Sequence, residues 1–169
     1  KEILKNELIQ ASNKLNRLIS RLEKKQGMGA GLDIYDKKGR LSFPVKGKVL
    51  NNFGRKKDKN LNTYIVYNGV NISSSKGASV RAVFGGKILY TGTLEGYGNI
   101  IILGHGNEYH SLYGHLDEFI TKVGKIVRSG QIIGRSGDTG SIFGESLYFE
   151  IRHKGVPIEP MAWLDGSNK

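Results

Sequence analysis

The sequence predicts a mostly β protein, an antiparallel sandwich or open barrel, preceded by one N-terminal α-helix. Three observations lead to this class. Apolar side chains recur at alternating steps of three and four over residues 1–25. From Tyr64 onward the apolar period falls to two, and glycine-rich turns separate the short runs. No helical pattern of ~12 residues interrupts that region, so we expect its strands to pair antiparallel.

The N-terminal helix has the seam of a coiled coil. Apolar residues follow heptad spacing at Leu4, Leu8, Ala11, Leu15, Leu18 and Leu22. Ile3, Ile9 and Ile19 widen the apolar face beyond a two-stranded seam. We therefore predict that residues 1–26 form a coiled-coil or regulatory helix, the end of a longer coiled coil. Two interpretations stay open: a plain coiled coil, or a helix that docks on its own domain.

The rest of the chain divides into a linker and one domain. Residues 27–42 are expected to form a glycine-rich hinge and an irregular polar linker, and residues 43–165 the folded domain. Residues 56–62 are expected to form a charged loop, and residues 116–120 a short helical turn. Strands are expected over residues 49–55, 65–72, 79–83, 86–91, 99–103, 111–115 and 147–152, with a strand pair over 123–134.

The net charge of +11 is unevenly distributed. Residues 1–60 carry 16 Lys and Arg against 6 Asp and Glu, a net of +10, whereas residues 61–169 carry 10 against 9, a net of +1. A nucleic-acid-binding domain carries its basic stripe on the folded domain, so nucleic acid is not an expected partner. No apolar run reaches the ~20 residues of a membrane span. These residues contain no signal peptide, and we expect targeting information to lie outside them.

The glycines and aromatic residues of residues 43–164 follow a known pattern. The matching pieces include Gly69-Val70-Asn71-Ile72, Tyr113-Gly114-His115-Leu116 and Leu147-Tyr148-Phe149-Glu150-Ile151-Arg152. This pattern resembles the LytM-type (M23 family) zinc endopeptidases, which cut peptidoglycan cross-links. The resemblance implies the β fold of that family, a duplicated hybrid motif.

The same resemblance indicates that the metal site has been lost. The family pattern is HxxxD, then a lone His, then HxH, and it falls here on Tyr67, Asn71, His115, Ser146 and Tyr148. Only the lone His is present. A zinc ion that activates water needs about three ligands drawn from imidazole, carboxylate or thiolate groups. Tyr and Asn replace these donors poorly. We therefore predict a degenerate domain with no metal, no cofactor and no catalytic residues.

The remaining histidines do not suggest a relocated metal site. His105, His110 and His115 are spaced by five, which puts neighbours on opposite faces of a strand. We expect His105 to lie in a turn, His153 to be exposed and His115 to pack at the groove.

Within the family, the chain resembles the EnvC-like murein hydrolase activators, which combine a coiled coil with a degenerate LytM domain. Those proteins relieve the autoinhibition of a cell-wall amidase. The resemblance implies a partner-binding groove at Asn68, Asn71, Tyr97, Ile100, Tyr113, Tyr148 and Arg152. Asn68 and Asn71 depart from the basic and aliphatic residues expected there. Tyr and Arg are enriched where a few residues carry binding energy, so the residue types also favour a groove for a partner helix.

The resemblance thus implies a non-catalytic activator of a zinc-dependent cell-wall amidase (N-acetylmuramoyl-L-alanine amidase), acting in septal peptidoglycan splitting in a Gram-negative periplasm. Helix 1–25 is expected to lie in or near the groove and to restrain it. A divisome or membrane protein that pulls the coiled coil is a candidate second partner, and peptidoglycan is another.

Two alternative functions remain open. One is a zinc metalloendopeptidase of peptidoglycan cross-links with non-standard ligands, which tightly bound zinc and cross-link cleavage would reveal. The other is a passive peptidoglycan-binding module that uses the basic N-terminal region, which a strong salt dependence of binding would reveal.

Overall fold

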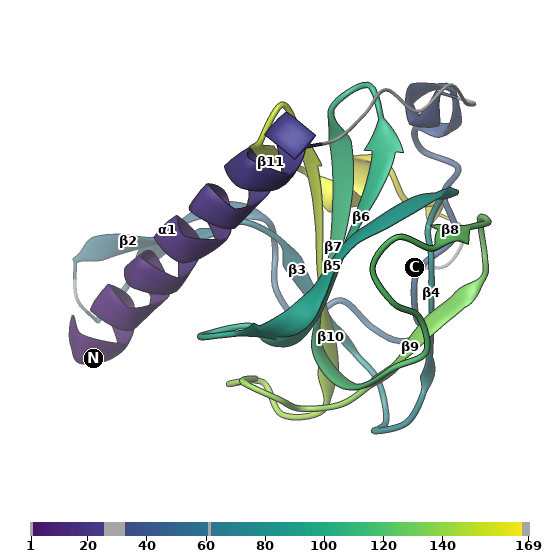
Figure 1. The fold of residues 1–169 in the computed structure, drawn as a ribbon. Coiled ribbons are helices and arrows are strands. Elements are labelled where there is room, and N and C mark those ends of the chain that lie inside the picture. The colour runs from purple at the N-terminus through teal and green to yellow at the C-terminus, as the bar shows by residue number, and fades with distance from the viewer. Residues whose placement is uncertain (1, 26–32, 61, 167–169) are drawn as a thin grey trace.

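The structure, a computed structural model, describes residues 2–25, 33–60 and 62–166, and within the first helix the side chains of residues 9–22. One long helix, α1 (Glu2–Lys25), packs against a β domain (Figure 1). The domain begins with the 3₁₀ helix η1 (Ile34–Lys37) and ends with η2 (Pro160–Ala162). Its strands are β1 (Gly54–Asp58), β2 (Thr63–Tyr67), β3 (Val70–Ser73), β4 (Ser79–Arg81), β5 (Gly86–Leu94), β6 (Gly98–Gly106), β7 (Tyr109–Phe119), β8 (Ile126–Val127), β9 (Ile132–Ser136), β10 (Ser146–His153) and β11 (Val156–Ile158).

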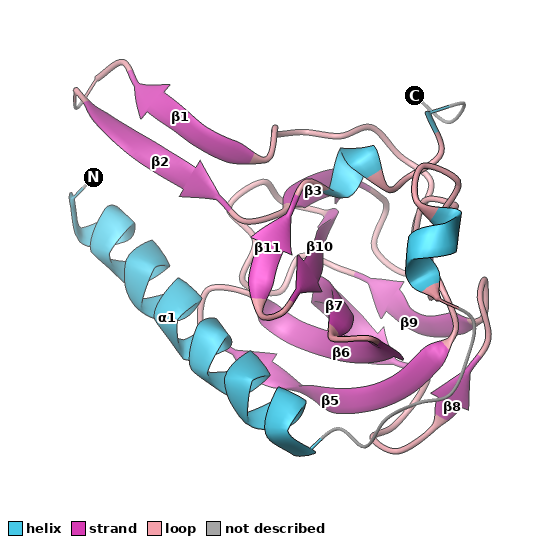
Figure 2. Cartoon of the chain, turned by 90° about the horizontal axis from the view of Figure 1, so that it is seen from above, coloured by secondary structure: helices cyan, strands magenta, loops and turns pink. Residues whose placement is uncertain are grey.

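Two antiparallel sheets make up the β structure. The large sheet has the strand order β11-β10-β7-β6-β5-β8, with β3 paired to β10 and with β9 joining β4 to β7. Strands β1 and β2 form a separate hairpin that projects from the domain on the side of the N-terminal end of α1 (Figure 2). The mostly β, antiparallel class with one N-terminal helix is therefore confirmed.

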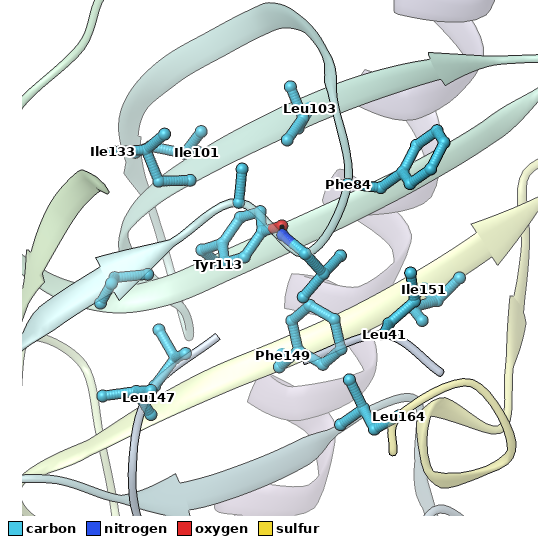
Figure 3. Close-up of a cluster of buried hydrophobic side chains, with 14 of the residues drawn as sticks. Leu41, Phe84, Ile101, Leu103, Tyr113, Ile133, Leu147, Phe149, Ile151 and Leu164 are labelled. Atoms are coloured by element: carbon cyan, nitrogen blue, oxygen red, sulfur yellow. Dashed lines mark hydrogen bonds between the residues drawn. The ribbon is translucent and has the colours of Figure 1, made fainter. Parts of the chain in front are cut away.

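Each face of the central strands packs against a different partner. Along β6 the side chains alternate, so that Ile101 and Leu103 enter the main core while Ile100 and Ile102 face α1. The main core also contains Tyr113 and Phe149, whose rings lie among aliphatic side chains (Figure 3). The opposite face forms a second cluster beneath the helix.

The helix uses its predicted seam to pack on the domain. Ala11, Leu15 and Leu18 are buried, together with Ile19. They pack in one cluster with Tyr97 of the β5–β6 turn and with Ile100, Ile102 and Leu112 of the sheet. Ile9 points away and is 50% exposed, and the side chains at positions 3, 4 and 8 lie outside the described residues. Docking on its own domain is therefore the interpretation that the structure supports.

Part of the predicted linker belongs to the domain. Ile34 and Leu41 are buried in the main core, and Leu41 pairs with Leu164 in a parallel β-bridge. The side chain of Asp33 caps η1 by accepting a hydrogen bond from the Tyr35 backbone N–H. The two buried apolar positions, 34 and 41, are too few to show a period. The predicted hinge at 27–31 lies outside the described residues.

Several local predictions were wrong. Residues 56–62 are not simply a charged loop, because β1 pairs with β2 and Arg55 lies 3.7 Å from the centre of the Tyr64 ring. The strand expected over 65–72 is interrupted at Gly69, where a Cβ atom would lie 2.4 Å from the Phe149 carbonyl oxygen. The helical turn expected over 116–120 is instead the end of β7, which pairs there with β9.

Two histidines are also placed differently from the prediction. His105 lies in β6 rather than in a turn and is buried. Its Nδ1 donates to the Gly85 carbonyl at 2.8 Å, and its Nε2 lies 2.7 Å from Ser111 Oγ. His153 is half-buried rather than exposed, because its ring stacks on Tyr109 with centroids 3.9 Å apart.

Candidate functional site

Four of the five positions on which the family's metal-site pattern is expected to fall lie on adjacent strands. Asn71 on β3 pairs with Tyr148 on β10, and Tyr148 pairs on its other side with Gly114 of β7. The next residue, His115, has its ring centroid 5.9 Å from that of Tyr148. Tyr67 is half-buried at the end of β2 and, within the described residues, makes no hydrogen bond or ring contact with the other four.

Asn71 and Ser146 occupy the places where the family pattern has an aspartate and a histidine. Both side chains are buried, with exposed fractions of 4% and 0%. The Asn71 side-chain amide donates to Ser146 Oγ at 3.2 Å, and Ser146 Oγ also lies 3.2 Å from Ser141 Oγ. These groups therefore satisfy one another as a neutral polar pair, which is the arrangement expected of buried polar side chains.

His115 is held in place by both its backbone and its ring. Its backbone has a φ of +60°, a conformation that non-glycine residues rarely adopt, and its N–H donates to the Tyr97 carbonyl at 2.8 Å. The ring Nδ1 donates to the Thr139 carbonyl at 2.7 Å, which leaves Nε2 as the acceptor nitrogen. Burial lowers the pKa of this imidazole, which is therefore neutral at pH 7.

The donors around His115 do not fit a zinc ion that activates water. The Tyr148 hydroxyl donates to the Glu150 carboxylate at 2.5 Å. Burial, and next the charge of Glu150, raise the pKa of Tyr148 well above its usual value, so a phenolate ligand does not form at neutral pH. Among the described residues there is no group of three or more His, Cys, Asp or Glu that could hold a metal ion. One imidazole falls short of the roughly three protein ligands that such a site requires.

A buried ion pair lies next to Tyr148 on the same strand. Arg152 Nε donates to Glu150 Oε1 at 2.6 Å, and the two side chains are 1% and 0% exposed. Arg152 Nη1 donates to the Gly155 carbonyl at 3.1 Å and to Asn16 Oδ1 of α1 at 2.8 Å. Its Nη2 is buried without a hydrogen-bond partner in the part of the chain that the structure describes. Burying a charged group is costly unless its hydrogen-bonding groups are paired. Asn16 of the docked helix supplies one of the hydrogen-bond acceptors that Arg152 requires.

Further polar contacts join α1 to the sheet. The Asn68 side-chain amide donates to Ser12 Oγ at 2.9 Å, and the Tyr97 side chain is hydrogen-bonded to the same serine. Ser12 and Asn16 are one helical turn apart and lie beside the buried seam. The helix also comes very close to the β5–β6 turn, since a Cβ atom at Gly96 would lie 2.6 Å from Ala11 Cβ.

The groove residues expected from the sequence are mostly found beneath α1. Tyr97, Ile100 and Tyr148 belong to the helix-facing cluster, while Asn68 and Arg152 hydrogen-bond to the helix. Asn71 lies beside this surface and contacts Ser146 instead.

The prediction that Tyr113 lines the groove is wrong. Its ring lies in the main core on the opposite face, and its hydroxyl accepts from the Val83 N–H at 3.0 Å. Leu112, not Tyr113, is the β7 residue that faces the helix, because neighbours on a strand point to opposite sides.

Three residues of this surface were missed by sequence reasoning: Glu150, Ser12 and Asn16. Glu150 could have been found, because the period of two along β10 puts positions 148, 150 and 152 on one face. Nothing in the helix alone distinguishes Ser12 and Asn16 from solvent-exposed polar residues.

Comparison with known proteins identifies the family. Residues 66–160 match the sequence profile of peptidase family M23. The chain belongs to peptidase family M23. No helix among its described residues is long and apolar enough to cross a membrane.

Proteins similar to this M23 domain include murein hydrolase activators and a zinc containing peptidase. It is 35% identical over 127 residues to murein hydrolase activator EnvC of Escherichia coli (strain K12), covering 75% of this chain and 29% of that protein. It is 37% identical over 123 residues to murein hydrolase activator NlpD of the same organism, covering 72% and 30%. A zinc containing peptidase from Vibrio cholerae superposes with a TM-score of 0.68 at 26% identity, covering 73% of this chain and 40% of that one.

The chain therefore spans about a third of the length of the curated relatives it matches. Both activators and a zinc peptidase share its fold, so the fold alone does not decide the function.

Proposed function

We propose that this chain is a non-catalytic activator of a periplasmic cell-wall amidase (an N-acetylmuramoyl-L-alanine amidase) and binds that enzyme through the metal-less groove. The groove is the helix-facing surface formed by Asn68, Tyr97, Ile100, Tyr148 and Arg152. The similarity to proteins named murein hydrolase activators supports the general role. The proposal places the protein in septal peptidoglycan splitting in a Gram-negative envelope.

One observation carries the proposal: the groove is already occupied by a helix. Leu15 and Ile19 fill its apolar part, while Ser12 and Asn16 meet its polar part. A surface that accepts an amphipathic helix in this way fits the helix-in-groove mode of recognition. Tyr and Arg side chains at its centre are the residue types that most often dominate binding energy.

In the proposal, the state with α1 docked in the groove is the inactive state. A partner can bind only where α1 is displaced, so α1 lowers the apparent affinity by the fraction of chains in which it is docked. In the proposal, a divisome or membrane protein that acts on the N-terminal helix shifts this equilibrium towards the open groove. The amidase then binds the exposed tyrosines and Arg152.

The zinc endopeptidase alternative has less support. It would require ligands at Asn71 and Tyr148, yet the Asn71 amide donates to Ser146 and the protonated Tyr148 hydroxyl donates to Glu150. Passive peptidoglycan binding stays a prediction; the basic hairpin residues Arg55, Lys56 and Lys57 are exposed.

An amidase assay on dye-labelled sacculi tests the proposal. The wild type is compared with Leu15→Ser/Ile19→Ser, which removes the apolar anchors of α1 and should raise amidase-dependent dye release. Tyr148→Ala and Asn68→Ala, each added to that variant, should lower it again. Tyr64→Ala removes a tyrosine that is 46% exposed on the hairpin and serves as the matched control.

Two results would contradict the proposal. Activation that survives both Tyr148→Ala and Asn68→Ala would leave the groove without a role, provided that melting curves show folded variants. Dye release or cross-link cleavage by the chain alone, without amidase, would favour the peptidase alternative. Pelleting with sacculi at rising salt concentration measures the passive-binding alternative separately.

A further inference from the structure

Exposed aliphatic side chains gather at the turn that connects β7 to β8. Ile120, Val123 and Ile126 are 45%, 56% and 73% exposed and lie within seven consecutive residues. Single exposed apolar residues are ordinary on a soluble protein, whereas a contiguous group marks an interaction surface more often. The proposed function makes no use of this group.

The backbone holds these side chains outward. The Gly124 N–H donates to the Ile88 carbonyl, and the Ile88 N–H donates to the Lys125 carbonyl, both at 2.8 Å. The neighbouring Val127 is only 2% exposed and anchors β8 in the core. Because both sides of the turn are fixed, Val123 and Ile126 cannot fold back to bury themselves.

Two lysines lie among the aliphatic residues. Lys122 and Lys125 are exposed within the same seven residues, while the acidic residues Asp117 and Glu118 precede them on β7. Lys87 on β5 is the cross-strand partner of Ile126, so the two exposed side chains share one face of the sheet. We call this surface the apolar–basic patch: Lys87, Ile120, Lys122, Val123, Lys125 and Ile126.

The residue types of the apolar–basic patch favour one class of partner over the others. Peptidoglycan offers carboxylates but no hydrocarbon to cover the aliphatic tips. Protein hot spots are enriched in Trp, Tyr and Arg, none of which is in the patch. An anionic phospholipid surface offers both acyl chains and negative headgroups, and it attracts clustered lysines next to apolar residues. We propose that the apolar–basic patch docks the domain on an anionic phospholipid membrane.

The position of the patch is compatible with a free groove. Strand β5 begins at the patch, where Gly86 pairs with Val127, and ends near α1, where the following Glu95 forms an ion pair with Lys14. In both views β8 and α1 lie at opposite ends of this strand (Figures 1 and 2). Lipid binding through the patch therefore leaves α1 exposed, and the inference does not depend on the proposed function.

Vesicle flotation tests this inference on the whole chain. Binding is expected to vesicles of equal parts phosphatidylcholine and phosphatidylglycerol and not to phosphatidylcholine alone. Lys122→Glu/Lys125→Glu should weaken binding by at least roughly 25-fold, since each lysine near an anionic surface contributes about a factor of five. Val123→Ser/Ile126→Ser should abolish flotation by removing the inserting tips. All four positions are exposed, so unchanged melting curves are expected.

Two matched variants make the test specific. Lys56→Glu/Lys57→Glu reverses two charges on the β1–β2 hairpin, and Ile142→Ser/Val156→Ser removes two aliphatic side chains that are 63% and 60% exposed elsewhere. Both should still float. No flotation of the wild type, equal flotation with neutral vesicles, or equal loss in the hairpin variant would overturn the inference. So would retention on sacculi that depends on Lys122 and Lys125 while vesicles are not bound.

Discussion

The two faces of the central sheet are built differently. On the inner face, Ile101 and Phe149 are fully buried in a large apolar cluster. On the outer face, Ile100 and Leu112 are just as buried, but they lie next to the Glu150–Arg152 ion pair and beneath a helix that contributes hydrogen-bond partners. The inner face is closed by the sheet strands and the segments packed on them, whereas the outer face is closed by α1, which lies far away in the sequence.

This difference indicates which contacts within the chain a partner protein can replace. A mixture of aliphatic, tyrosine and arginine side chains with hydrogen bonds across it is typical of protein–protein interfaces. The outer face thus has the composition of an interface that α1 fills within the same chain. We expect α1 to leave in a local opening while the sheet stays folded, as elements with separable contacts do.

The largest effect is expected on the inner face. Phe149→Ala removes a fully buried ring and should lower the free energy of unfolding by about 3–5 kcal/mol. Urea denaturation followed by tryptophan fluorescence measures this, since Trp163 is in the same core. A loss below about 1 kcal/mol would show that the inner face is not the main source of stability.

Acid should destabilise the protein through one histidine near each face. Burial lowers the pKa of His105, in the inner network, and of His110, beside Arg152, to about 4 each. Between pH 6.5 and 4 the unfolded chain therefore binds more protons than the folded one. Stability is fully present above pH 6.5 and falls as the pH drops, by about 1.4 kcal/mol per pH unit for each histidine. Denaturation at several pH values should show a smaller slope in His105→Gln, and an unchanged slope would contradict this assignment.

Loosening the helix should have a local effect. Leu15→Ala removes a fully buried side chain whose contacts belong to the helix-facing cluster. Such a change costs about 2–5 kcal/mol in a core, but here the loss is limited to the free energy of α1 docking. Hydrogen exchange should become faster in residues 9–22 and stay slow in β6 and β10. Equal acceleration in both would mean that helix and sheet unfold as one unit.

The smallest effect concerns a single hydroxyl group. Ser12→Ala removes the hydrogen-bond partner that Asn68 and Tyr97 share and should weaken docking by about 0.5–1.5 kcal/mol for each bond. Ser20→Ala is the matched control, because that hydroxyl bonds only to the Asn16 carbonyl within the exposed part of α1. Exchange rates of the α1 amides should rise in the first variant and not in the second. Equal rates in both variants would mean that the hydrogen bond between Asn68 and Ser12 does not stabilise the docking of α1.

The period of the apolar residues was sufficient to predict the β class, whereas the loss of zinc ligands at positions 67, 71, 146 and 148 stays a prediction. Tyr113 was misplaced because the resemblance assigned it to the groove, whereas the alternation along β7 turns it to the face opposite Leu112. The heptad seam left two interpretations open, since Leu15 and Leu18 satisfy a second helix or a sheet groove equally well. Only the structure brings Asn16 to Arg152, 136 residues away.

Whether α1 and a partner compete for one surface is best tested by hydrogen exchange of α1 with and without the bound amidase. If both use the groove, the amides of residues 9–22 lose protection when the amidase binds, while those of β6 and β10 stay protected. Binding of the amidase with α1 protection unchanged would contradict the account, because the helix would then still cover Tyr97 and Arg152.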